Sequence, residues 1–178
     1  WGGMVDAKMA TALTGRNGQA LEDYKKRLLK LNNQVVAQAP EDLVINTHVC
    51  RGNYHSTFFS SGAYDSVADL LFGEENVNAY YLEYDDKRSG GFAPLAKVSG
   101  DKKVVLGLIT TKIPQLEDKG KVIARIHEAE KYIPLDRLYL SPQCGFASCE
   151  IGNKLTEEEQ WEKLKLVKEI AEEVWGDR

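Results

Sequence analysis

The chain has 178 residues, of which 43% are hydrophobic and 28% charged, and a formal net charge of −4. This is the size of one globular domain, which we take as 1–178, and the composition excludes collagen, coiled-coil and disordered chains. The acidic balance excludes the basic surface that binds nucleic acid, and no apolar run reaches the roughly 18 residues of a membrane span. Three cysteines, an odd number, predict reduced thiols in a cytoplasmic protein.

Amphipathic segments alternate with short apolar runs along the chain. Residues 1–40 are expected to form a helical lead-in, and the segment opens at Trp1 like a piece of a longer protein. The helix predicted within it carries an apolar stripe of Leu21, Tyr24, Leu28, Leu31 and Val35. The predicted helices cover 20–37, 64–72, 119–132 and 156–175. The last of them begins with a capping box, Thr156 and Glu159.

The apolar runs are predicted strands at 43–47, 79–82, 104–109 and 138–140. They are too continuous for half-exposed strands, so we expect burial on both faces. Strands alternating with helices indicate parallel strands joined by right-handed crossovers. A doubly wound sheet and a (β/α)8 barrel both fit this pattern. A complete barrel takes about 250 residues, so four units would make half of one.

Four potential metal ligands follow the predicted strands. His48 and Cys50 stand two apart at the end of the first strand, and alternate residues of an extended chain face the same side. Glu83 ends the second run, and Cys144 follows the fourth. Each alone is more often an incidental, capping or buried residue, but all four lie at carboxyl ends of parallel strands, where barrels place their chemistry. The pattern predicts a zinc site.

The ligand set indicates what such a site does. Two thiolates and a carboxylate carry three negative charges against the two positive charges of zinc, which leaves the centre at −1. Such a centre suits the deprotonation of an incoming thiol and its activation as a nucleophile. Glu83, the hardest ligand, is the predicted displaceable ligand. A structural zinc module is the competing interpretation, but it normally uses closely spaced Cys pairs.

Polar residues beside these ligands are candidates for substrate binding. Arg51 and Asn53 follow Cys50, and Arg88 lies in the glycine-rich stretch after Glu83. Either arginine is suited to bind a carboxylate. Ordinary surface charges in βα loops explain any one of them equally well. The remaining thiol and imidazole groups are expected to lie outside the site: Cys149, His55 and His127.

From Leu43 to the C-terminus the sequence resembles the cobalamin-independent methionine synthases, especially a short single-barrel branch. The resemblance rests on His48-x-Cys50, Leu82-Glu83-Tyr84 and Pro142-x-Cys144-Gly145. It implies that His48, Cys50, Glu83 and Cys144 bind zinc in the C-terminal half of a (β/α)8 barrel. The implied reaction transfers a methyl group from a methylated folate to the thiol of homocysteine, which forms methionine.

The sequence also departs from this family. The full-length enzymes carry a proton-transferring histidine in an Asp-Ile-His-Ser-Pro-Arg-Ile-Pro stretch, and the matching segment here, 108–114, has none. Thr110, the candidate catalytic residue here, or Thr111 is suited to hydrogen-bond substrate, but neither replaces a general acid near neutral pH. Three alternatives stay open: another thiol or methyl donor, a non-catalytic zinc-stabilised fragment, or a metal-free decarboxylase of the related porphyrin type. A half-barrel exposes sheet edges, so we expect self-association or pairing with an N-terminal half.

Overall fold

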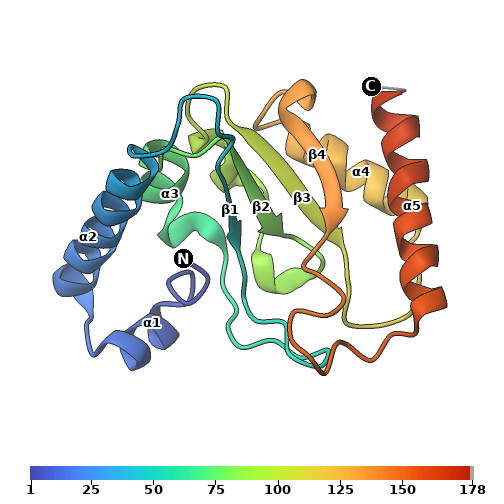
Figure 1. Cartoon of the computed structure of the whole chain (residues 1–178), viewed down its shortest axis with the longest axis horizontal. Coiled ribbons are helices and arrows are strands. Elements are labelled where there is room, and N and C mark those ends of the chain that lie inside the picture. Colours follow the sequence, from blue (N-terminus) through green and yellow to red (C-terminus); the bar gives the residue numbers. More distant parts are fainter. Residues whose placement is uncertain (177–178) are drawn as a thin grey trace.

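The computed structural model describes residues 1–176, and its core is one parallel sheet. The four strands are β1 (Asn46–Val49), β2 (Ala79–Glu83), β3 (Lys103–Ile109) and β4 (Leu138–Pro142). They lie side by side in the order β1-β2-β3-β4, which is also their order along the chain (Figure 1). A doubly wound sheet reverses its strand order at a switch point, whereas a barrel adds each strand beside the last. The observed order is therefore that of four consecutive units of a barrel.

Helices connect the strands and flank the sheet. The α-helices are α1 (Ala7–Thr14), α2 (Gly18–Val36), α3 (Ala68–Glu74), α4 (Lys119–Glu130) and α5 (Glu157–Trp175). Short 3-10 turns complete the connections: η1 (Tyr64–Ser66), η2 (Lys87–Ser89), η3 (Ala93–Lys97) and η4 (Leu135–Arg137). In Figure 1, α1 and α2 lie on the β1 side of the sheet, and α5 lies on the β4 side. The predicted capping box of α5 is confirmed, because Thr156 and Glu159 bond each other's backbone N–H.

The expectation of strands buried on both faces is confirmed for β3, where Val104 to Ile109 are all buried, and is wrong for β2 and β4, where one face is partly open. Val49, Leu82 and Leu106 are in register across β1, β2 and β3 and are each at most 1% exposed. In the adjacent row of the same strands, Tyr81 is 40% exposed, and Tyr139 of β4 is 46% exposed. Aromatic and β-branched residues on an open barrel interior give the same continuous pattern as fully buried strands.

The first strand begins later than predicted. Leu43 and Val44 are exposed and stand outside the sheet, and pairing with β2 begins at Asn46. The reason is local: Ile45 donates its backbone N–H to the side chain of Asn78 and accepts from the backbone N–H of the same residue. These bonds take the place of the first rungs of the ladder.

Two helix predictions also need correction. In α2 the buried residues are Leu21, Lys25 and Leu29, whereas Leu31 and Val35 of the predicted stripe are 48% and 74% exposed. The contact face is thus an i, i+4, i+8 row that includes a lysine, which hydropathy does not mark. The predicted helix at 64–72 is η1 followed by α3, because the backbone leaves helical geometry at residue 67. No helix within residues 1–176 is both long and apolar enough to cross a membrane.

Candidate metal centre

The four predicted ligands come together at the carboxyl end of the sheet. One ligand atom from each of His48, Cys50, Glu83 and Cys144 lies within 4.8 Å of all the others. His48 is the third residue of β1, Cys50 follows that strand, Glu83 ends β2 and Cys144 lies two residues beyond β4. The strands of Figure 1 all point downwards, so these residues share one rim of the fold. The expected juxtaposition is present in the structure.

Two of three distances between ligand atoms match the edges of a zinc tetrahedron, and the distance from Cys144 to Glu83 is shorter. His48 Nε2 lies 3.3 Å from Cys144 Sγ, Cys50 Sγ lies 3.7 Å from Cys144 Sγ, and Cys144 Sγ lies 3.0 Å from Glu83 Oε1. Zinc bonds of about 2.0–2.3 Å in a tetrahedron give ligand–ligand edges of roughly 3.3–3.8 Å. Cys50 and Cys144 are free thiols, and their 3.7 Å separation is well beyond a disulfide bond of about 2.05 Å.

Glu83 is held by both its backbone and its side chain. The hydroxyl of Tyr64 accepts the backbone N–H of Glu83 at 3.0 Å and donates to its carbonyl at 3.2 Å. The backbone N–H of Arg51 donates to Oε1 at 2.8 Å. Glu83 and Tyr64 are both 0% exposed. The carboxylate is therefore pre-positioned by a buried network that reaches across from the loop after β1.

Outer hydrogen bonds also orient the other ligands. His48 Nδ1 lies 3.0 Å from the carbonyl of Tyr81, so with the proton on Nδ1 the imidazole presents Nε2 to the cluster. The backbone N–H of Gly52 donates to Cys50 Sγ at 3.2 Å. Such partners fix the tautomer of a metal-binding histidine and stabilise a thiolate. The carbonyl of Tyr81 in β2 thus orients His48, and the backbone N–H of Gly52 supports Cys50.

The four groups of the cluster have shifted pKa values. Hydrogen bonds from Cys144 and His48 lower the pKa of Cys50 to about 3. The pKa of Cys144 is raised, because its proton bonds Cys50, the thiol is buried and Glu83 lies beside it. Burial raises the pKa of Glu83, although the N–H of Arg51 opposes the shift. Hydrogen bonding to Cys50 raises the pKa of His48. Hydrogen-bonded protons thus link the four side chains, and a divalent cation would replace these protons.

A buried oxygen supports the fit to zinc. Glu83 Oε2 has no hydrogen-bond partner among residues 1–176 and is shielded from water. A buried carboxylate oxygen without a partner costs free energy, and a metal ion would satisfy it. Imidazole, two thiolates and a carboxylate are also the donor types that zinc accepts in tetrahedral sites. The residues present therefore fit a zinc ion.

Arg51 lies inside the fold beside this cluster. Its side chain is 1% exposed, and its guanidinium donates to the carbonyl of Gly62 and to the hydroxyl of Tyr64. The guanidinium carbon also lies 4.2 Å from the centroid of the Tyr64 ring. These contacts brace the loop that carries Cys50. The predicted role of Arg51 in substrate binding stays a prediction.

Asn53 joins the loops after β1 and β4. Its amide nitrogen donates to the carbonyl of Gly145 and to Ser148 Oγ, both at 2.7 Å. Its amide oxygen accepts from Lys112 at 2.9 Å and from Asn153 at 3.0 Å. An asparagine side chain has two donors and two acceptor sites, so all four are used within the protein. A contact of Asn53 with substrate likewise stays a prediction.

The two remaining candidates lie in the loops after β2 and β3. Arg88 pairs with Asp85 and Asp86 and stacks 4.1 Å from the centroid of the Phe58 ring. The backbone N–H of Thr110 donates to Glu117 at 2.9 Å. Both residues stand on the same rim as the metal ligands, and their roles toward substrate stay predictions.

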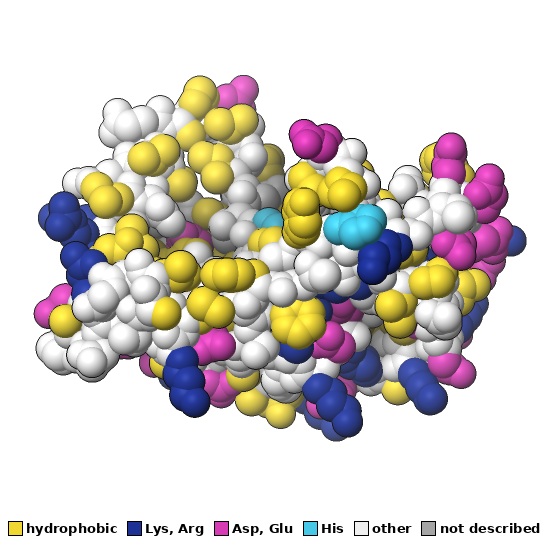
Figure 2. Space-filling model, turned by 90° about the horizontal axis from the view of Figure 1, so that it is seen from below, with side chains coloured by type: hydrophobic (Ala, Val, Ile, Leu, Met, Phe, Trp, Pro, Cys, Tyr) yellow, Lys and Arg dark blue, Asp and Glu magenta, His cyan; other side chains and the backbone are white. Residues whose placement is uncertain are grey.

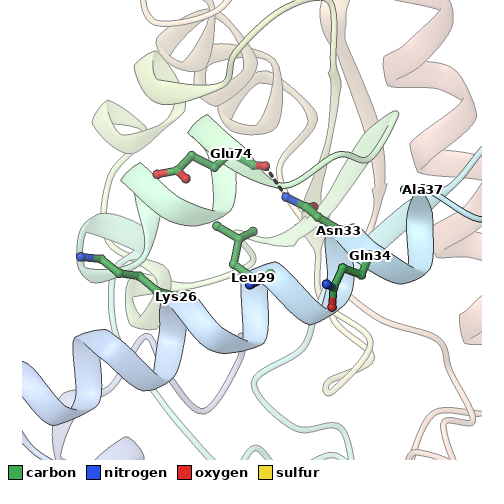
Figure 3. A pocket seen from close by; sticks show the side chains of 7 residues that line it. Lys26, Leu29, Asn33, Gln34, Ala37 and Glu74 are labelled. Carbon is green, nitrogen blue, oxygen red and sulfur yellow. Dashed lines mark hydrogen bonds between the residues drawn. The ribbon is translucent and has the colours of Figure 1, made fainter.

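A hollow opens beside the ligands. It measures about 310 Å³ and is lined by His48, Tyr81 and residues 141–145. Figure 2 views the molecule from this end and shows hydrophobic side chains spread across the face. A larger groove of about 520 Å³ lies between α2 and α3, where Asn33 bonds the backbone of Glu74 (Figure 3). Its lining contains no histidine or cysteine, so the metal-binding chemistry belongs to the smaller hollow.

Comparison with known proteins agrees with this geometry. Residues 20–173 match the protein family described as "Cobalamin-independent synthase, Catalytic domain". The chain belongs to this family. Over 159 residues it is 49% identical to the uncharacterized Bacillus subtilis (strain 168) protein YxjG, and the match covers 89% of the chain and 42% of YxjG.

Solved structures of the family share the fold. A Listeria monocytogenes structure assigned as a vitamin-B12-independent methionine synthase is 35% identical, with a TM-score of 0.69, covering 97% of this chain and 47% of that one. A B12-independent methionine synthase from Shewanella sp. W3-18-1, in complex with selenomethionine, has a TM-score of 0.68 at 20% identity, covering 86% and 44% of the two chains. The predicted fold class, the C-terminal half of a (β/α)8 barrel, is confirmed. The chain spans less than half the length of these relatives.

Sequence reasoning missed three residues that support the centre. Tyr64 holds the backbone of Glu83, Lys112 bonds Asn53, and Gln143 accepts from the hydroxyl of Thr111. All three are at most 9% exposed. The only sequence signals were a tyrosine at the start of a predicted helix and a lysine and a glutamine close to predicted strand ends, which are too common to identify these residues.

Proposed function

We propose that the protein is a zinc-dependent methyltransferase that moves a methyl group from a methylated folate to the thiol of homocysteine, forming methionine. The observation that supports this most strongly is the cluster of His48, Cys50, Glu83 and Cys144, whose ligand atoms lie within 4.8 Å of one another in a family of cobalamin-independent synthases. A bound zinc ion would supply a positive centre that favours the thiolate form of a substrate.

The chain's own residues prepare that site for a thiol. His48, Cys50 and Cys144 are the ligands that we propose to stay in place, and Glu83 is the one that gives way. A carboxylate is a harder ligand than a thiolate, so it is the weakest partner of the set for zinc. The hydroxyl of Tyr64 and the guanidinium of Arg51 bond the backbone of Glu83, so only its side chain has to move.

The surroundings fit small, partly apolar substrates. The hollow of about 310 Å³ beside the ligands is at the lower end of ligand pockets, which suits an amino acid better than a large molecule. Tyr54, Phe58 and Phe59 of the loop after β1 are each more than half exposed. Exposed aromatic rings offer stacking surfaces for a flat heteroaromatic methyl donor.

Metal content tests the zinc assignment. The chain is loaded with zinc, dialysed and analysed for bound metal beside Cys144→Ser and Cys149→Ser. Cys149 is the third free thiol and lies outside the cluster, so it provides a matched control. We expect one zinc per chain in the unmodified protein and in Cys149→Ser, with a loss in Cys144→Ser. Equal zinc in all three proteins would contradict the ligand assignment.

Turnover tests the reaction. Methionine formation from homocysteine is measured with a methylated folate and, in a parallel assay, with S-adenosylmethionine, on this chain and on a longer protein that contains it. Methionine from the folate alone supports the proposal. Methionine from the second donor alone would favour the alternative of another methyl donor, for which the lack of a histidine in 108–114 is the specific observation. Bound zinc without methionine in either protein would favour a non-catalytic zinc-stabilised role.

A further inference from the structure

Lys112 is a buried cation without a carboxylate partner. It is 9% exposed, and Asn53 Oδ1, at 2.9 Å, is the one described acceptor of its ammonium group. No ion pair within residues 1–176 includes it. The other buried lysines are paired: Lys25 with Glu22, and Lys163 with Glu117. Buried charges are normally neutralised by a partner, so the isolation of Lys112 requires an explanation.

The ammonium group is held in place at the metal rim. Asn53 Oδ1, its acceptor, is also bonded by Asn153 at 3.0 Å. The other end of the Asn53 amide bonds the carbonyl of Gly145, the residue after Cys144. Lys112 therefore lies between the loop that follows Cys50 and the loop that follows Cys144, and the network leaves it little freedom to turn toward solvent.

The ammonium group bonds the loop that also supports the Glu83 carboxylate. Its acceptor, Asn53, stands two residues after Arg51, whose backbone N–H donates to Glu83 Oε1 at 2.8 Å. A positive charge at this place favours the ionised form of a nearby carboxylate that it does not touch. It acts at a distance, which distinguishes it from a ligand.

The proposed reaction would create a negative charge on the rim that holds Lys112. With zinc bound, two thiolates and a carboxylate would leave the centre at −1. A substrate thiol would give its S–H proton to solvent, and its sulfur would replace the Glu83 oxygen as a ligand, which would release the carboxylate as an anion. The sum of charges at the rim would fall from −1 to −2, with no change of oxidation state. The released carboxylate stays in a buried environment, since Glu83 is 0% exposed.

We propose that Lys112 is the counter-ion that stabilises the Glu83 carboxylate after a substrate thiol has displaced it. This inference rests on the proposed function. Lys112 is a positioning residue, because it acts on substrate binding through Glu83 and Asn53 and not by contact. A counter-ion of this kind lowers the free energy of the thiol-bound state more than that of the resting state, since only the former carries the additional charge.

The test measures thiol binding to the zinc-loaded chain by calorimetry. Lys112→Gln removes the charge but keeps an N–H for Asn53, Lys112→Met removes both, and Lys112→Arg retains the charge. Lys121→Gln, on an exposed position of α4, controls for the loss of one lysine. Two thiols are used: homocysteine, and 2-mercaptoethanol, which has neither a carboxylate nor an amine. Zinc-edge absorption counts sulfur ligands before and after thiol addition.

We expect Lys112→Gln and Lys112→Met to bind both thiols roughly tenfold more weakly than the unmodified chain, from the loss of one charge interaction at close range. Lys112→Arg and Lys121→Gln should change the dissociation constants less than about twofold on the same scale. The zinc content should be the same in all five proteins, so the readout does not depend on turnover.

Three results would overturn the inference. Unchanged affinity for both thiols in Lys112→Gln and Lys112→Met would show that the charge does not matter. Weaker binding of homocysteine alone would show that Lys112 contacts the substrate carboxylate. An unmodified chain that binds zinc but neither thiol would overturn the proposed function together with this inference, whereas the first two results leave the proposed function intact.

Discussion

Replacing Tyr64 by phenylalanine removes one oxygen from the support of Glu83. That hydroxyl accepts from Arg51 Nη1 at 2.8 Å and from the backbone N–H of Glu83 at 3.0 Å. In Tyr64→Phe the backbone N–H of Glu83 stays buried without this acceptor, at about 1–3 kcal/mol, whereas Arg51 Nη1 keeps a longer bond of 3.4 Å to the carbonyl of Glu83. A loss near 2 kcal/mol corresponds to a fall in Tm of about 4–8 °C for a chain of this length. Circular dichroism melting of the zinc-free chain measures it.

The same substitution should also weaken zinc binding, because the backbone that positions the Glu83 carboxylate loses its bonds to the Tyr64 hydroxyl. Losing such an outer hydrogen bond typically costs 10- to 100-fold in metal affinity. Tyr80→Phe is the matched control: Tyr80 is also 0% exposed, but its hydroxyl donates to the carbonyls of Leu71 and Glu75, away from the cluster. We expect Tyr80→Phe to lower the Tm without changing zinc affinity. Equal zinc affinities for the two variants, measured by chelator competition, would refute the reasoning.

Other perturbations test the fold around the site. A Cβ at Gly107 would lie 2.6 Å from the carbonyl oxygen of Leu82, so Gly107→Ala should destabilise the chain by about 3 kcal/mol in urea unfolding. Gly73 lies in α3 with open space around its Cα, so Gly73→Ala should stabilise the chain by about 0.5–1 kcal/mol. Lys163→Met leaves the carboxylate of Glu117 partly buried and unpaired, and should cost about 3 kcal/mol in the same assay. The last test removes the metal. If free zinc is a thousandfold above its Kd, adding a chelator should lower the free energy of unfolding of the zinc-loaded chain by about 4 kcal/mol. An unchanged Tm after chelation would contradict a metal site in the folded state.

The sequence was sufficient to predict that the four candidate ligands come together, because the place of each rests on a local rule. Residues two apart in an extended chain face the same side, which places His48 with Cys50. Carboxyl ends of parallel strands meet at one edge, which brings Glu83 and Cys144 to the same place. Neither rule requires the exact ends of a strand. The predicted juxtaposition is therefore present although β1 begins three residues later than expected.

The residues that support the cluster, such as Tyr64 and Lys112, could not be predicted from the sequence. They are common residue types whose contacts join distant parts of the chain. Tyr64 lies 19 positions from Glu83, and Lys112 lies 59 positions from Asn53. In a linear pattern a lysine after a strand indicates solvent, and only the packing of loops around it shows that it is buried. The face of α2 was misassigned for the same reason, since Lys25 is buried by bonding the carbonyl of Ser66.

We expect zinc binding and turnover to depend on different parts of the fold. All four ligands, with Tyr64, Arg51 and Lys112 behind them, come from the described strands and the loops that follow them. Tyr81 and Tyr139, in the row of the sheet that contains His48, are 40% and 46% exposed, so the chain by itself leaves that face open to water. Activation of a thiolate benefits from a site that excludes water. We therefore expect the chain to bind zinc at full stoichiometry on its own, and turnover to increase when a further protein segment covers the open face.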